Sequence, residues 1–287
     1  MKKPQIKWML LPLLVAGITL GSCEKEDAGD EISADAEVFT TASLEQADES
    51  DWITEEIAFL GDEIMGQDEI SASGKGIADS GYFPECVTIT TVVTDTSVEK
   101  TIDFGMGCEL PNGNVLTGMI LMTLSKDAEA ATRTGTLELA GFTFNGIAVA
   151  GEASLFRQRM NENGVPQSDF EAAFSAEWPD GATASWTGNR TREWIEGFGS
   201  GFWADNVFLI TGSRTFINRQ GHTFERTVLE SLRREWSCRF IVSGLLQLSR
   251  DGQQAELNFG DGSCDGFGTL TLPNGTEEEI RLRRARR

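Results

Sequence analysis

The residues best suited to chemistry are arginines and tryptophans that recur on one face of three neighbouring stretches, 182–194, 206–218 and 224–236. Successive side chains of a β-strand point to opposite faces, so residues two apart share a face. Aromatic planes stack on flat ligands and guanidinium groups bind acids, so this face, if exposed, would bind a glycan or an anionic ligand. The alternative is a half-buried face in which arginine stems cover the rings and acidic partners meet the charges. The candidate ligand-binding residues are Trp186, Arg190, Arg192, Trp194, Arg214 and Arg226.

Residues for catalysis are sparse. His222 is the only histidine and lies at an expected hairpin turn, and Gly199-Ser200-Gly201 does not match the Gly-x-Ser-x-Gly pattern. The 45 acidic residues would allow a carboxylate-based hydrolase of the glycosidase type, but their abundance selects no pair. No phosphate-binding glycine motif is present in the sequence. We therefore assign no catalytic residue and no cofactor, and expect no enzymatic activity, with a hydrolase acting on polysaccharide as the alternative.

The residues before Cys23 have the pattern of an N-terminal secretory signal. Lysines at positions 2, 3 and 7 precede an apolar run over residues 8–20, which is too short and wrongly flanked for a membrane span. Leu20-Gly21-Ser22-Cys23 resembles the lipobox of bacterial lipoproteins, whose signal is cut before the cysteine. The resemblance implies that Cys23 is acylated and that a membrane is a partner through this N-terminal lipid anchor.

Four cysteines remain once Cys23 is lipidated, and an even number in an exported protein indicates disulfides. Four cysteines allow three connectivities, of which Cys86–Cys108 and Cys238–Cys264 is the obvious one. A zinc site is disfavoured because the close Cys-x-x-Cys spacing is absent from the sequence. We expect two disulfides and no metal.

The charge of the chain is concentrated near its N-terminus. The net charge is −21, and residues 24–70 alone contain 17 acidic residues against one lysine. An acidic chain repels phosphate backbones, so we expect no nucleic-acid partner.

The whole chain divides into four parts, three of them in its N-terminal third. Residues 1–22 are the signal, and residues 23–42, acidic and poor in large apolar groups, predict a flexible tether. Over residues 43–66, Ile53, Ile57, Leu60 and Ile64 fall on one helical face, which predicts one short helix that Gly66 ends. The helix and a linker fill residues 43–79, and the apolar stripe should pack on the domain of residues 80–287.

Strand patterns follow one another through residues 80–287. Tight-turn residues such as Asn145-Gly146 and Asp251-Gly252 separate them, which predicts antiparallel hairpins and an all-β domain. The pattern does not choose among an elongated sheet, a sandwich and a barrel. The expected strands cover 87–94, 98–104, 115–124, 134–144, 147–160, 168–178, 182–195, 207–217, 223–236, 240–248, 255–259, 268–272 and 277–282.

A cysteine loop occurs twice. In each copy a cysteine-led strand is followed by a strand that ends in Phe-Gly-x-Gly and a cysteine, at Cys108 and at Cys264. With the lipobox and the long Thr/Arg/Trp strands, these loops resemble a group of Bacteroidota lipoproteins labelled hypothetical, for which no activity is established. The copies differ at Met106, where the second has Asp261. The segment from Asp261 to Gly266 resembles the opening of a calcium loop, but the glutamate an EF-hand needs is replaced by Leu272.

Lys25-Glu26-Asp27, directly after the cysteine, resembles the export signal of surface-exposed Bacteroidota lipoproteins. It implies an outer-membrane, lipid-anchored protein exposed at the cell surface. We expect such a protein to be a non-enzymatic binding or structural module.

Overall fold

The computed structural model describes residues 39, 41–72, 82–126 and 131–282. These residues belong to one compact unit, Ser33–Arg287. The signal, Cys23 and most of the predicted tether lie outside the described residues. No helix in the described ranges is long and apolar enough to cross a membrane.

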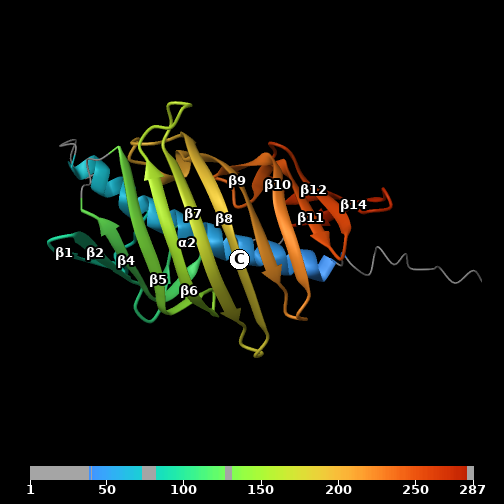
Figure 1. Cartoon of the computed structure of the whole chain (residues 1–287), viewed down its shortest axis with the longest axis horizontal. Helices are drawn as coiled ribbons and strands as arrows, with labels where there is room; N and C mark the ends of the chain where they lie inside the picture. Colours follow the sequence, from blue (N-terminus) through green and yellow to red (C-terminus); the bar gives the residue numbers. More distant parts are fainter. Residues whose placement is uncertain (1–38, 40, 73–81, 127–130, 283–287) are drawn as a thin grey trace, which may run out of the picture. The chain divides into compact units, whose positions relative to one another are not determined.

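One antiparallel sheet of fourteen strands makes up most of the described chain. The strands pair in chain order from β1 to β14, except that β2 pairs with β4 and the two-residue β3 also pairs with β4. Figure 1 shows the strands side by side, crossed on one face by helix α2 (Thr41–Ala72). The strands are β1 (Thr88–Val93), β2 (Ser97–Asp103), β3 (Cys108–Glu109), β4 (Val115–Ser125), β5 (Thr132–Phe144), β6 (Ile147–Gln158), β7 (Gln167–Glu177), β8 (Thr183–Glu196), β9 (Val207–Ile217), β10 (Thr223–Glu235), β11 (Ile241–Arg250), β12 (Gln253–Asp261), β13 (Phe267–Thr271) and β14 (Glu277–Arg281).

The all-β prediction is confirmed, and the architecture is an open meander with β1 and β14 at its two edges. The thirteen expected strands coincide with observed ones to within a few residues, and β9 has the bounds expected. Strand β3 was not predicted. The pairing Cys86–Cys108 and Cys238–Cys264 is confirmed, with Cα atoms 5.6 and 5.8 Å apart.

Helix α2 is longer than predicted, because it continues past Gly66 to Ala72. The prediction that Gly66 ends it was wrong, and the packing gives the reason. A Cβ on Gly61 would lie 2.8 Å from Leu155 Cδ2, and one on Gly66 would lie 3.6 Å from Arg157 Nη2. Glycine at position 61 lets the helix backbone approach the sheet closely. At Gly66 the helix is still in ordinary packing contact with the sheet, and this tertiary contact outweighs the tendency of glycine to end a helix.

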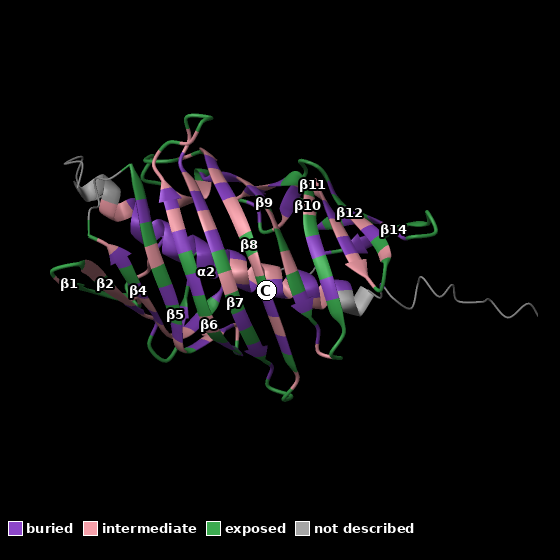
Figure 2. Cartoon of the chain, in the orientation of Figure 1, coloured by how far each residue is buried: buried purple, intermediate pink, exposed green. Residues whose placement is uncertain are grey.

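The core lies between α2 and the sheet. The predicted stripe of Ile53, Ile57, Leu60 and Ile64 is at most 1% exposed, as expected. Figure 2 shows buried and exposed residues alternating along the strands, as in a sheet with one covered and one open face. Helix residues outside the stripe are buried as well, including several carboxylates, and a buried charge needs a partner.

Candidate functional site

Ion pairs link the carboxylates of α2 to cations of the sheet along most of the helix. The helix contains ten acidic residues and no basic one. The cations come from strands β2, β5, β8, β9 and β10 and from the turn after β9. The pairs are Lys100–Asp68 at 2.7 Å, Arg133–Asp68 at 3.0 Å, Arg190–Glu55 at 2.5 Å, Arg219–Glu49 at 2.9 Å, Arg192–Asp62, Arg214–Asp51 and Arg226–Asp51.

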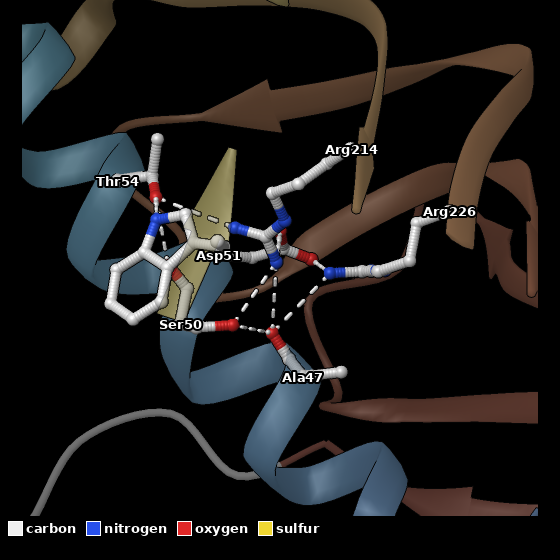
Figure 3. A network of polar contacts seen from close by, with 7 residues as sticks. Ala47, Ser50, Asp51, Thr54, Arg214 and Arg226 are labelled. Carbon is white, nitrogen blue, oxygen red and sulfur yellow. Dashed lines mark hydrogen bonds and ion pairs between the residues drawn. The ribbon is translucent and has the colours of Figure 1, made fainter. Parts of the chain in front are cut away.

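Asp51 is shared by two arginines. Arg214 on β9 and Arg226 on β10 are directly opposite each other in the register, an arrangement that brings like charges together. Each carboxylate oxygen of Asp51 accepts one guanidinium, so a single helix residue compensates both (Figure 3). We call Arg190, Arg192, Arg214 and Arg226, with Asp51, Glu55 and Asp62, the arginine clasp.

Backbone and hydroxyl groups of the helix complete the partners of Arg214. Its Nη2 donates to the Ala47 carbonyl at 3.2 Å and to Ser50 Oγ at 3.1 Å, and Arg226 Nη1 donates to the same carbonyl at 3.3 Å. Trp186 Nε1 donates to Thr54 Oγ1 at 2.8 Å. Burial lowers the pKa of Arg214 to about 9, although the charge of Asp48 acts in the opposite direction.

Arg192 lies deepest of the clasp arginines, at 3% exposure. Asp62 accepts a hydrogen bond from Arg192 and another, at 2.6 Å, from Ser168 Oγ. The guanidinium of Arg192 lies 4.4 Å from the centre of the Phe208 ring. Burial lowers the pKa of Arg192 to about 10, against the charge of Glu55. The clasp is therefore a largely buried network, with Asp51 partly exposed, in which each of the four arginines has a carboxylate partner on the helix.

All six candidate ligand-binding residues lie on adjacent strands and share the helix-facing side of the sheet. The expectation that this face is exposed and free to bind a ligand was wrong. Trp186 and Trp194 are 2% and 8% exposed, and α2 occupies the face that a ligand would need. The observed arrangement is the alternative one, in which acidic partners meet the arginines.

Glu56 is held in a second buried cluster. Tyr82 donates its hydroxyl to Glu56 Oε1, and Asn112 and Asn114 each donate an amide to Oε2 at 2.7 Å. Burial raises the pKa of Glu56, although these hydrogen bonds act to lower it. The cluster fixes the middle of the helix to the start of β4.

A trough lies on the sheet face opposite α2. Its volume is about 980 Å³ and it spans strands β4 to β10. On β8, Thr187 and Asn189 point into it while Trp186 and Arg190 point to the helix, as strand alternation requires. Its exposed polar lining consists of Thr123, Thr136, Glu138, Glu152, Ser154, Glu171, Thr187, Asn189, Ser213, Thr215, Glu225 and Thr227.

Carboxylates give the trough its charge. Glu138 on β5 and Glu152 on β6 are directly opposite each other, and Glu171 on β7 is opposite Asn189 on β8. Directly opposed like charges destabilise a sheet, so this pair is not explained by stability. Arg214 and Arg226 are among the residues that line the trough, but their guanidinium groups lie on the helix-facing side of the sheet, where Asp51 binds both.

No family model, curated protein or solved structure matches this chain.

The remaining residues considered for chemistry lie in a turn or at the end of a strand. His222 is exposed, and its backbone N–H donates to Asn218 Oδ1 at 2.9 Å. Asp261 accepts from the hydroxyl of Ser263 at 2.8 Å and from its backbone, which lowers the pKa of Asp261. In the described part of the chain, no group of three or more His, Cys, Asp or Glu side chains could hold a metal.

Two groups of residues were missed from the sequence. The helix carboxylates were counted as charge but not as partners, although their number beside an arginine-rich face was an available signal. The trough residues were seen only as the polar face of β8. Their alternation continues on β5, β6, β7, β9 and β10, and this wider pattern could have indicated an extended polar surface.

Proposed function

We propose that this protein is a lipid-anchored cell-envelope protein whose folded part is a non-enzymatic binding module for a neutral, hydroxyl-rich ligand, such as a glycan chain. The observation that supports it best is the trough, with its hydroxyl, amide and carboxylate groups from seven adjacent strands. Such groups donate and accept hydrogen bonds with hydroxyls. The interior is filled by α2, which disfavours a carrier that encloses its ligand.

The charge of the trough favours a neutral ligand over an anionic one. Glu138, Glu152, Glu171 and Glu225 line it, whereas Arg214 and Arg226 are neutralised by Asp51. Carboxylates repel an acidic polymer and accept hydrogen bonds from neutral hydroxyls. The anionic ligand expected from the arginine face loses its support, because those arginines face the helix.

Affinity electrophoresis on panels of neutral and uronic-acid polysaccharides tests this function. We expect at least one neutral polysaccharide to retard the protein, and Asn189→Ala combined with Glu171→Gln to reduce that retardation at least tenfold. Glu177→Gln, an exposed change on β7 outside the trough, is the matched control. Retardation only by acidic polymers, or retardation unchanged in the double variant, contradicts the proposal.

The anchor is tested separately. Cys23→Ser should release the protein from the membrane fraction, because a chain without the acyl groups loses its hydrophobic attachment. A Cys23→Ser variant that still fractionates with outer membranes contradicts the anchor.

A carboxylate-based hydrolase is the second candidate, and the Glu138–Glu152 pair favours it. Opposed residues have Cβ atoms about 5 Å apart, and retaining glycosidases hold their two carboxyl groups about 5–5.5 Å apart. Release of reducing ends from a bound neutral polysaccharide, lost in Glu152→Gln while binding persists, would support it. Binding without release supports the module.

A further inference from the structure

The two edges of the sheet differ in their protection. An edge strand exposes unpaired N–H and C=O groups that can pair with another chain, and natural proteins block such edges with charge. Edge strand β14 has three consecutive glutamates, Glu277 to Glu279. Edge strand β1 reads Thr-Ile-Thr-Thr-Val-Val and contains no charged residue, proline or glycine. One edge is therefore blocked and the other is open to pairing.

Strand β1 is exposed and already ordered. All six of its residues are exposed, with Val92 at 53% and Val93 at 64%. Each is paired with β2, from Thr88 opposite Asp103 to Val93 opposite Val98. The Cys86–Cys108 disulfide joins the residue two before the strand to β3. The edge is thus preformed, and a partner strand would not have to order it.

The apolar residues of β1 continue the covered face of the sheet. Ile89 is opposite Ile102, which is buried, and Val93 is opposite Val98, which packs partly buried against the core. Ile89, Thr91 and Val93 therefore lie on the helix-facing side. A further strand beside β1 would cover Ile89 and Val93 as β2 covers its own neighbours.

We propose that β1 pairs antiparallel with β1 of a second copy of this chain, with the two Thr91 residues opposite each other on a two-fold axis perpendicular to the sheet. In this register Ile89 is opposite Val93 of the second copy on the helix-facing side, and Thr90 is opposite Val92 on the other. Apolar residues thus meet β-branched residues on both faces, pairs that stabilise antiparallel sheets. The inference is independent of the proposed ligand.

Charge selects this partner strand. With a net charge of −21, two copies repel each other at most surfaces, and the glutamates of β14 would oppose one another in an equivalent pairing. The five residues of β1 that overlap in this register, Ile89 to Val93, contribute no charge. Extending the register places the nearest carboxylates, Glu85 and Asp95, opposite Ser97 and Val87 of the second copy, so they do not oppose each other.

Sedimentation equilibrium of the full chain tests the pairing. The protein concentration should reach about 100 µM, because a short strand pair gives a small and weak interface. We expect a mass that rises to twice the monomer mass. Thr91→Glu places two carboxylates opposite each other on the two-fold axis and should restore the monomer. Within one chain the new carboxylate is opposite Lys100, so the fold should be kept. Thr134→Glu, the same change at an exposed position of β5, should leave the dimer intact.

Cross-linking tests the register. Under oxidation Thr91→Cys should form a covalent dimer on non-reducing gels, and Thr90→Cys should form at least tenfold less, because it faces Val92. A monomer at every concentration, or a dimer that Thr91→Glu leaves unchanged while its thermal midpoint matches the parent chain, overturns the proposal. Pairing of β1 only with a different protein also overturns it.

Discussion

Asp51 compensates two positive charges at once, so its loss should be felt more than that of other carboxylates. Asp51→Asn leaves Arg214 and Arg226 opposed on neighbouring strands, with side chains only 10% and 6% exposed. Asp51 itself is 30% exposed, so water screens part of the effect. We expect a loss of about 2–3 kcal/mol in the free energy of unfolding, measured with urea. Glu162→Gln, in an exposed turn, should change it by less than about 0.5 kcal/mol.

Glu56 should make the protein more stable as the pH is lowered toward 4.5. Its pKa is raised in the fold, so between the unfolded value near 4.5 and the folded value the native protein binds more protons. Its contribution is therefore fully present below pH 4.5 and is lost as the pH rises through the folded pKa. Relative to Glu56→Gln, the parent chain should gain stability in urea unfolding as the pH falls from 7 toward 4.5. A difference that stays constant or moves the opposite way contradicts this assignment.

Side-chain chemistry was readable from the sequence where it depended on alternation and unreadable where it depended on distant partners. The shared face of Arg190, Arg214 and Arg226 follows from spacing of two along each strand. Their pairing with Asp51 and Glu55 depends on the rotation of a helix more than 130 residues away. Tyr82 meeting Glu56 depends in the same way on tertiary packing, and no local pattern encodes it.

Among the elements, β8 and β9 approach each other closely at Gly188. A Cβ there would lie 2.4 Å from the Ser213 carbonyl oxygen and 2.7 Å from Arg214 Cα, both backbone atoms that cannot yield cheaply. Gly188→Ala should destabilise the protein by about 2 kcal/mol. The thermal midpoint should then fall by roughly 4–8 °C. Thr187→Ala, on the exposed neighbour, should change the midpoint by less than about 2 °C, and equal shifts would show that the close approach is unimportant.

Element bounds were predictable for the strands and less so for the helix. Alternation and turn residues located β4 to β14 because both signals are local. Gly66 was expected to end α2 because glycine usually does so, but here tertiary contact overrides propensity. Strand β3 has two residues, which is too short for any alternation to appear.

On the scale of the folded unit, α2 is part of the core and should not open independently. Ile53, Ile57 and Phe59 are fully buried, and the clasp fixes the helix on several strands. Native-state hydrogen exchange should show amides of residues 53–65 exchanging only through global unfolding, with protection free energies equal to that of the whole unit. Exchange of these amides at a lower free energy than those of β6 to β9 would mean that the helix detaches by itself.

Whether the sheet would stay open or close was not predictable. Hairpin signals specify which strands are neighbours but not how the first and last strands relate. That α2 covers the inner face explains how an open sheet buries its apolar residues, and this depends on contacts between residue 47 and residue 226 that no local pattern contains.

The order of the chain also sets the order of assembly. Helix α2 precedes every strand in the chain, yet the clasp arginines lie more than 120 residues after the carboxylates with which they pair. The hairpins and the Cys86–Cys108 loop, which spans 22 residues, can close while the chain is still emerging, since short loops cost little entropy. The clasp carboxylates Asp51, Glu55 and Asp62 therefore have no ion-pair partner until β8 to β10 have formed, so refolding should be slow at the step that docks α2 and fast at the hairpins.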